Sequence, residues 1–207
     1  YTHQQASENM NTFWAGCGLI RRDVFIRLNG FNEAYHQPSI EDIELGYRLI
    51  ESGGVIRIDK DVKVKHLKKW TLFNMIYTDV FRRAMPWSNL LDQYPGIEHN
   101  NLNLRSKEKL SAMLVMMVFV TSLCVMMIST QFAFVLTLLL IMIIALNIGF
   151  YSLLHRKIGG YSLPAAVLLH WIYYLSAMMG FLLSRLTNLL GLKKKSVFDQ
   201  KFPSVTE

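Results

Sequence analysis

The hydrophobic positions divide the chain into two unlike parts. From residue 110 onward they form three long apolar runs, at residues 110–128, 132–154 and 161–185. Each run reaches about 20 residues, the length that an α-helix needs to cross the hydrocarbon core of a bilayer. Before residue 110 the apolar residues come in short groups separated by polar ones. The pattern predicts a mixed N-terminal part and an all-α transmembrane region at residues 105–192.

Short polar breaks separate the three runs. Residues 129–131 lie between the first two, which therefore read as a helical hairpin, whereas residues 155–160 separate the second run from the third. The basic residues that flank the first two runs are Arg105, Lys107, Lys109, Arg156 and Lys157. The positive-inside rule places both flanks, and the N-terminal part with them, in the cytoplasm. A full crossing by the third run would put the basic residues 193–195 outside, against the rule, whereas a re-entrant or interfacial path would keep them inside.

Residues 39–50 have the apolar spacing of a short amphipathic helix. Ile43 and Tyr47 recur at a helical interval, with further apolar residues widening the face they lie on. Ser39 is a candidate N-cap, and the two glycines at residues 53–54 are a signal for the helix end.

The first turn of this helix carries two adjacent carboxylates, Glu41 and Asp42. The positive end of the helix dipole favours the ionised form of a carboxylate placed there. An ionised carboxylate fixed on rigid structure can accept a proton from an attacking hydroxyl, so Asp42 is a candidate general base. The same letters fit a capping box, in which Asp42 would only accept a hydrogen bond from the backbone N–H of Ser39.

Short segments on either side of this helix supply further candidates. Gly16 and Gly18 permit a close approach of the backbone to a ligand, and Trp14 offers a ring that can stack on a sugar or a base. The alternative interpretation of these residues is an ordinary strand and turn with a buried Trp14. Residues 55–58 and 62–64 read as two short strands.

Metal and thiol chemistry have few candidates. His66 follows the second strand and is a candidate metal ligand, although a lone His is more often an ordinary surface residue. Cys17 lies in the polar part and Cys124 in an apolar run, which argues against a disulfide framework and a cysteine-based metal site. We expect the polar part to face a reducing cytosol.

Residues 69–104 combine an amphipathic helix with a polar connector. The apolar residues on one face of the helix are Phe73, Ile76, Tyr77, Val80, Phe81 and Ala84. Its other face carries Arg82 and Arg83, Pro86 is expected to end it, and Trp87 follows. Such a helix can lie in the membrane interface with its cations toward lipid phosphates, or it can pack on the soluble part.

Composition favours a membrane protein over a nucleic-acid-binding protein. Hydrophobic residues make up 52% of the 207 residues and charged residues only 18%, which is apolar for a soluble protein. The net charge of +7 comes with basic residues gathered around the apolar runs, as expected at an anionic membrane face. The chain begins with Tyr1 and has no signal-peptide pattern, so we expect it to be a piece of a longer protein.

Three motifs follow one another before residue 50: Gly16-x-Gly-x-x-Arg-Arg-x-x-Phe25, Asn29-Gly-Phe-Asn-Glu33 and Glu41-Asp-Ile-Glu-Leu-Gly-Tyr-Arg48. Together they resemble the second half of the catalytic domain of membrane-bound bacterial family 2 glycosyltransferases of the GT-A type, over roughly residues 10–90. The resemblance implies an α/β fold, a partial GT-A domain, at residues 1–68. An interfacial helix and connector at 69–104, transmembrane helices at 105–192 and a basic polar tail at 193–207 would follow.

The resemblance implies an inverting transfer of a sugar from a nucleotide-sugar donor to an acceptor hydroxyl. The acceptor would be a lipid or a cell-envelope glycan at the cytoplasmic face of the cell membrane. In that family the Asp of the Glu-Asp pair is the general base, which assigns this role to Asp42 with Glu41 beside it. The candidate substrate-binding residues are Trp14, Gly16, Gly18, Arg82, Arg83 and Trp87. A divalent cation, Mg or Mn, would offset charge on the leaving diphosphate.

The chain departs from the family pattern in two places. The Asp-x-Asp motif that holds the metal and the nucleotide belongs to the family's first half, and it does not occur before residue 40 here. The letters of Asp59-Lys-Asp61 fit, but they follow the helix of Asp42 and read as a turn, so we expect the stretch to be inactive alone. Many processive relatives carry Gln-x-x-Arg-Trp where Arg83-Ala-Met-Pro-Trp87 stands here, which argues against processive synthesis.

A second hypothesis needs no catalysis. The chain would be a polytopic membrane protein whose small cytosolic head binds a partner. Such a protein would share the hydropathy and the basic flanks, but it would not need Glu41 and Asp42, the paired glycines or the two arginines at residues 21–22 in this order. If the parent gene encodes a nucleotide-binding half upstream of this stretch, the glycosyltransferase hypothesis is favoured over the non-catalytic one.

Overall fold

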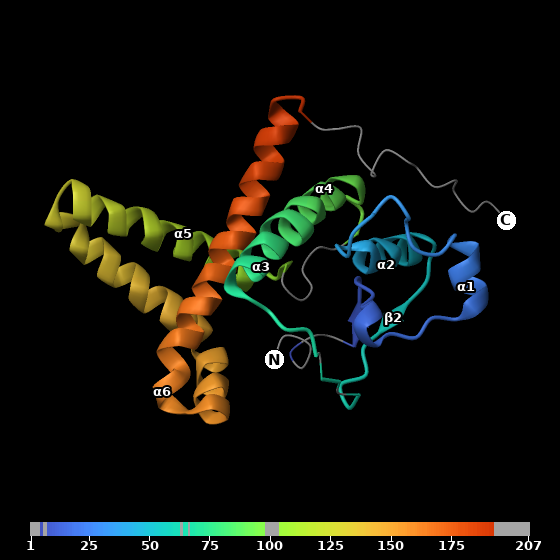
Figure 1. The fold of residues 1–207 in the computed structure, drawn as a ribbon, viewed down its shortest axis with the longest axis horizontal. Helices are drawn as coiled ribbons and strands as arrows, with labels where there is room; N and C mark the ends of the chain where they lie inside the picture. The colour runs from blue at the N-terminus through green and yellow to red at the C-terminus, as the bar shows by residue number, and fades with distance from the viewer. Residues whose placement is uncertain (1–4, 6–7, 63, 66, 98–103, 193–207) are drawn as a thin grey trace. The chain divides into compact units, whose positions relative to one another are not determined.

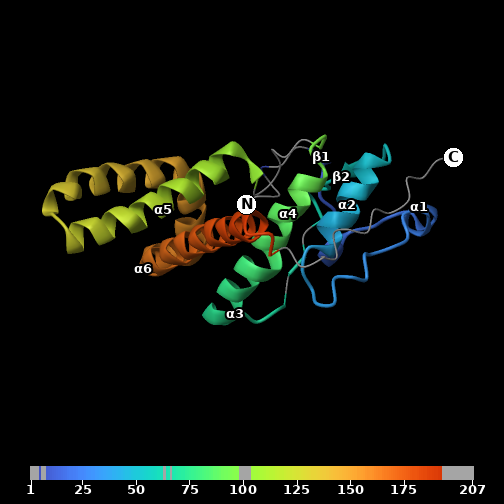
Figure 2. The same cartoon turned by 90° about the horizontal axis from the view of Figure 1, so that it is seen from above.

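The computed structural model describes residues 5, 8–62, 64–65, 67–97 and 104–192. The chain forms two compact units. The α2 unit comprises Tyr1–Leu102 and Gly180–Glu207, and the hairpin unit comprises Asn103–Met179. Figures 1 and 2 show their elements from two directions.

The α2 unit is mostly helical. Of the predicted α/β fold it contains only a small two-stranded sheet among the described residues. Its elements are β1 (Asn9–Met10), the 3-10 turn η1 (Ala15–Cys17), α1 (Arg22–Arg27), α2 (Glu41–Glu51), β2 (Ile56–Arg57), α3 (Leu72–Tyr77), the π-helix η2 (Thr78–Ala84) and α4 (Met85–Gln93). β1 and β2 pair antiparallel, with Asn9 opposite Arg57 and Met10 opposite Ile56. The backbone N–H of Asp61 then donates to the Asp59 carboxylate at 2.9 Å, and this turn takes the chain out of the sheet after β2.

α2 is the centre of this unit and is buried on almost every side. Two hydrophobic clusters flank it, one of Phe13, Leu28, Leu45 and Leu49 and the other of Ile40, Ile43, Tyr47 and Leu90. Gly46 lies against the segment before η1, because a Cβ there would come within 2.5 Å of the Phe13 backbone nitrogen. Only glycine therefore lets α2 approach that segment so closely.

α2 ends in a Schellman motif, as the two glycines predicted. Gly53 has a φ of 80°, and its N–H donates to the Ile50 carbonyl at 2.9 Å. The N–H of Gly54 donates to the Leu49 carbonyl at 2.9 Å. These two bonds satisfy carbonyls that the end of a helix otherwise leaves open, and the positive φ favours glycine at residue 53.

α3, η2 and α4 follow one another without a break, so the prediction that Pro86 ends this helix is wrong. In η2 the backbone widens, and the N–H of Met85 donates to the carbonyl of Val80, five residues earlier. Pro86 then lies in the first turn of α4 and has no N–H to donate to the turn before it. The Arg82 carbonyl, four residues earlier, accepts the Ser39 hydroxyl instead. The wider turn relieves the clash of the proline ring with the preceding backbone.

The hairpin unit consists of α5 (Ser106–Met127), the 3-10 turn η4 (Thr130–Phe132) and most of α6 (Ala133–Leu189). α5 and the helix over Thr130–Leu189 are long and apolar enough to cross a membrane. Only Gly159 leaves the helical conformation inside α6, with φ 76° and ψ 169°. The break predicted at residues 155–160 is therefore a kink at one glycine, where the chain turns back on itself (Figure 1).

The C-terminal part of α6, residues 180–189, belongs to the α2 unit and packs on η2 and α4. A Cβ at Gly180 would lie 2.5 Å from the Cβ of Ala84, so glycine permits this close contact. The Ser184 hydroxyl donates to the Asn89 side-chain carbonyl at 2.8 Å. Small and polar residues therefore join these helices.

Candidate functional site

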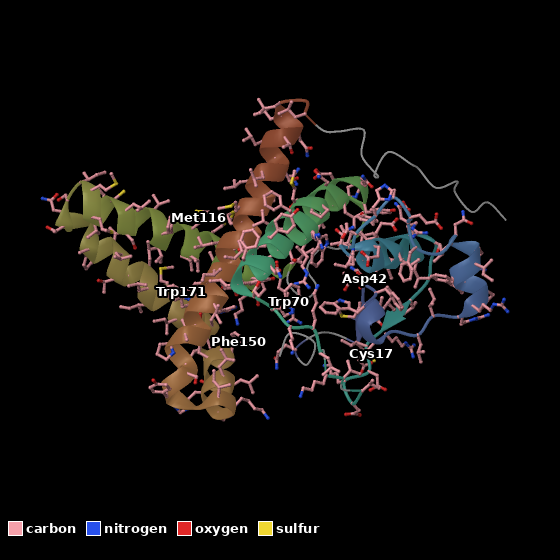
Figure 3. The ribbon with its side chains drawn as sticks, viewed as in Figure 1. Cys17, Asp42, Trp70, Met116, Phe150 and Trp171 are labelled. Atoms are coloured by element: carbon pink, nitrogen blue, oxygen red, sulfur yellow. The ribbon has the colours of Figure 1, made fainter. Side chains whose placement is uncertain are left out.

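The Asp42 carboxylate joins α2 to the η1 turn. Its Oδ2 accepts a hydrogen bond from the backbone N–H of Ala15 at 3.1 Å, and its Oδ1 accepts one from the N–H of Ile43 at 2.8 Å. Figure 3 shows Asp42 on α2 and Cys17 in the neighbouring turn. The carboxylate is thus fixed by backbone on both sides and keeps lone pairs for a further partner.

The alternative interpretation of Ser39 and Asp42 as a capping box is wrong. The N-cap of α2 is Ile40, and the N–H of Ser39 donates to Glu41 Oε2 at 2.7 Å. The Ser39 hydroxyl donates to the carbonyl of Arg82 in η2 at 2.6 Å. Glu41 therefore accepts the Ser39 N–H hydrogen bond that the capping box assigned to Asp42. The Asp42 carboxylate bonds to η1 instead.

The electrostatics of Asp42 are set mainly by burial, which raises the pKa of its carboxyl above the ordinary value of 3.8. The hydrogen bonds from the Ala15 and Ile43 N–H groups lower this pKa, and the negative charge of Glu41 raises it. The expected control by the helix dipole is thus outweighed. A carboxylate whose pKa is raised is a stronger base than an ordinary aspartate.

The residues around η1 differ in how they relate to this carboxylate. Trp14 directly precedes Ala15, and with 43% of its surface exposed it is not the buried tryptophan of the alternative interpretation. A Cβ at Gly16 would meet no atom of the described residues within 4 Å. At Gly18 it would come within 2.6 Å of the Trp14 carbonyl oxygen, so the chain's own packing accounts for this glycine.

The helix of residues 72–93 carries three further candidates, of which Trp87 reaches a side chain of α2. The Arg82 carbonyl receives the Ser39 hydroxyl, and the Trp87 indole N–H donates to the Tyr47 hydroxyl at 3.1 Å. Arg83 pairs with a carboxylate of its own helix, Asp79, at 3.0 Å. This helix therefore meets α2 through the Arg82 backbone and the Trp87 side chain, and Trp87 has a packing role there.

The buried ion pair of Glu44 and Arg48 was missed by the sequence analysis. The two side chains are each 5% exposed and lie 2.7 Å apart. Arg48 also donates to the carbonyls of Leu28 and of Gly30, the latter at 2.8 Å. Burial raises the pKa of Glu44, and the Arg48 guanidinium offsets part of that rise. The pair holds the end of α1 against α2 and thereby fixes the frame in which Asp42 lies.

No metal site is visible among the residues that the structure describes, because no three His, Cys, Asp or Glu side chains gather there. Asp42 and Glu41 are bonded to backbone N–H groups instead. His66, the candidate ligand from the sequence, lies outside the described residues.

The N-terminal part of the chain is similar to a known protein family. Residues 2–72 match a family model described as the N-terminal domain of galactosyltransferase. This match supports a glycosyltransferase domain at the N-terminal end of the chain. It includes η1 and α2, and therefore Trp14 and Asp42, but it stops before η2. Searches of curated proteins and of solved structures found no match.

Proposed function

We propose that this chain carries the acceptor-activating part of an inverting glycosyltransferase related to family 2, with Asp42 as the general base. The observation that carries the proposal is the Asp42 carboxylate, which two backbone N–H groups fix in place and whose pKa is raised by burial. These are the properties expected of a base that must be oriented and strong enough to take a proton from a hydroxyl. The family match over the same residues supports the chemistry.

The proposed reaction is a single displacement. The acceptor hydroxyl gives its proton to the Asp42 carboxylate, and its oxygen forms a bond to the anomeric carbon of the sugar. The bond between that carbon and the diphosphate oxygen breaks, and the nucleoside diphosphate leaves with the electron pair. Attack from the face opposite the leaving group inverts the anomeric configuration. The described residues hold no cluster of three metal-ligating side chains, so the divalent cation implied by the resemblance would take its ligands chiefly from the first half of the catalytic domain and from the donor diphosphate.

The proposed acceptor is a lipid or an envelope glycan at the cytoplasmic face of a cell membrane. α5 and α6 support the membrane part of this proposal, because they are long and apolar enough to cross a bilayer. Exposed rings on one side of α3 and η2 support this placement, because Phe73 is 76% exposed, Tyr77 44% and Phe81 50%. Aromatic rings with cations nearby are typical of a helix at the lipid surface. The Arg82 guanidinium lies 5.5 Å from the Tyr77 ring.

The test uses membranes that contain the protein expressed from its complete gene. They are incubated with a panel of radiolabelled nucleotide hexoses and a lipid extract, and the configuration of the new glycosidic bond is read by NMR. We expect one donor to give a labelled lipid or glycan whose anomeric configuration is opposite to that of the donor. A product with the donor's configuration would contradict the single displacement. Absence of any product across the panel, with intact donor binding, would favour the non-catalytic head.

A further inference from the structure

The kink at Gly159 creates a hollow on the hairpin unit. It is an open depression of about 340 Å³, lined by Ile148, Tyr151, Ser152, His155, Arg156 and Leu163. Leu163 lies after the kink and the other five residues before it. The reversal of the chain at this glycine therefore makes the hollow. Its volume lies in the range of sites that bind small molecules.

The lining of the hollow is mainly apolar and includes two basic residues. Ile148 and Leu163 are apolar, and His155 and Arg156 lie beside them in the lining. The His155 ring lies beside Gly160, with its Nε2 3.5 Å from where a Cβ would be, so glycine leaves the ring room. Within the part of the chain that the structure describes, no carboxylate lies within 4.0 Å of either Arg156 or His155.

The position of the hollow along the sequence indicates its depth in a membrane. The second apolar run ends at residue 154 and the third begins at residue 161. Residues 155–160 therefore lie where two long apolar segments give way to charge, which is the level of lipid headgroups if the segments are in a bilayer. At that level the negatively charged groups available to a cation are chiefly lipid phosphates.

We propose that this hollow binds the phosphate group of a membrane lipid. The Arg156 guanidinium offers a planar fork of N–H donors that matches two phosphate oxygens. His155 and the Ser152 hydroxyl donate to the remaining oxygens, and the first carbons of the lipid lie along Ile148 and Leu163. Free phosphate shares the charge but cannot use the apolar side, so the lipid binds more tightly. This site does not depend on the sugar-transfer reaction.

The test is lipid binding by the purified chain in neutral detergent, measured by native mass spectrometry and by titration. The probes are phosphatidic acid, phosphatidylcholine and inorganic phosphate. Arg156→Gln removes the charge that lines the hollow, and Lys157→Gln removes the neighbouring charge, which does not line it. We expect Arg156→Gln to weaken phosphatidic acid binding roughly tenfold, since a hydrogen bond to a charged group contributes enough for such a change. Lys157→Gln should bind like the unaltered chain.

Each outcome decides the proposal. Equal loss in Arg156→Gln and Lys157→Gln would reduce the effect to general charge and overturn the site. Inorganic phosphate binding as tightly as phosphatidic acid would overturn the lipid assignment, and phosphatidylcholine binding as tightly would overturn the preference for an exposed phosphate. His155→Gln provides a second variant with a smaller expected loss in the same direction. Retained affinity in both Arg156→Gln and His155→Gln would also contradict the proposal.

Discussion

The two units bury polar groups in different ways. Around α2, side chains also bond to the backbone of neighbouring loops: Arg48, besides its ion pair with Glu44, donates to the Gly30 carbonyl at 2.8 Å, and the part-buried Asp42 accepts from the Ala15 N–H at 3.1 Å. Between α5 and α6 they bond to one another, as in the 2.6 Å hydrogen bond from the Tyr174 hydroxyl to the Glu108 carboxylate. The turns around α2 leave backbone N–H and C=O groups without helical partners, so side chains can bond to them. Long helices satisfy their own backbone groups, so the polar side chains between α5 and α6 bond to side chains of the facing helix.

The largest effect that this comparison predicts is at the buried ion pair. Arg48→Met leaves Glu44 buried without its partner and removes the bonds to the loop after α1, so the free energy of unfolding should fall by about 3 to 5 kcal/mol. Chemical unfolding of the purified chain, followed by tryptophan fluorescence, measures it. Arg21→Gln is the control, because Arg21 is 80% exposed in its pair with Asp23 and its loss should leave stability unchanged. Equal effects of the two variants would remove the distinction between the pairs.

Gly46→Ala should give the next largest loss. The added methyl group would lie 2.5 Å from the Phe13 backbone nitrogen, and backbone cannot move aside as a flexible side chain can. We expect about 1 to 3 kcal/mol of destabilisation, measured by the same unfolding experiment. Gly96→Ala is the matched control, since its Cβ position has no atom of the described residues within 4 Å. An unaffected Gly46→Ala would mean that α2 does not need its close contact with the segment before η1.

A smaller effect is expected between the long helices. Tyr174→Phe removes the hydroxyl that joins Glu108 to Asn147, and interhelical hydrogen bonds of this kind contribute about 0.6 to 1.7 kcal/mol. Denaturation in mixed micelles measures the change. A loss as large as that of Arg48→Met would show that side-chain bridges and backbone-anchored pairs contribute equally.

The smallest predicted effect is a pH dependence of stability from Asp42. Because its pKa is raised in the folded state, the folded protein holds the proton more tightly than the unfolded chain does. The stability that this group contributes is therefore present below the ordinary pKa of 3.8 and is lost as the pH rises through the raised value. Asp42→Asn cannot titrate, so its stability relative to the unaltered chain should improve over that interval. Urea unfolding across a pH series measures this, and a constant difference would contradict the raised pKa.

The sequence predicts what depends on neighbours along the chain and misses what depends on distant residues. The helix at residues 39–50 and its glycine end are found within two residues of α2 and its Schellman motif. The role of Ser39 was wrong because its hydroxyl bonds to Arg82, 43 positions away. Pro86 was read as a helix end because nothing local reveals that η2 widens before it.

The buried ion pair was missed for the same kind of reason. Glu44 and Arg48 are four residues apart, the spacing of an ordinary surface pair on a helix. Tyr47 and Leu49 on both sides of Arg48 were the signal that this part of α2 has no polar face. The role of Asp42 as the base stays a prediction, and its anchoring to Ala15 could not be foreseen because it depends on how η1 folds back.

The role of Asp42 as the base is tested most directly by a comparison of Asp42→Asn with Glu41→Gln in the protein expressed from its complete gene. Both changes replace a carboxylate by a nearly isosteric amide in the same turn of α2. The measurement is kcat for sugar transfer beside the Kd for the nucleotide-sugar donor. We predict that Asp42→Asn lowers kcat by about 10²- to 10⁴-fold with the donor Kd unchanged, and that Glu41→Gln costs much less. Near-normal turnover by Asp42→Asn would contradict the account.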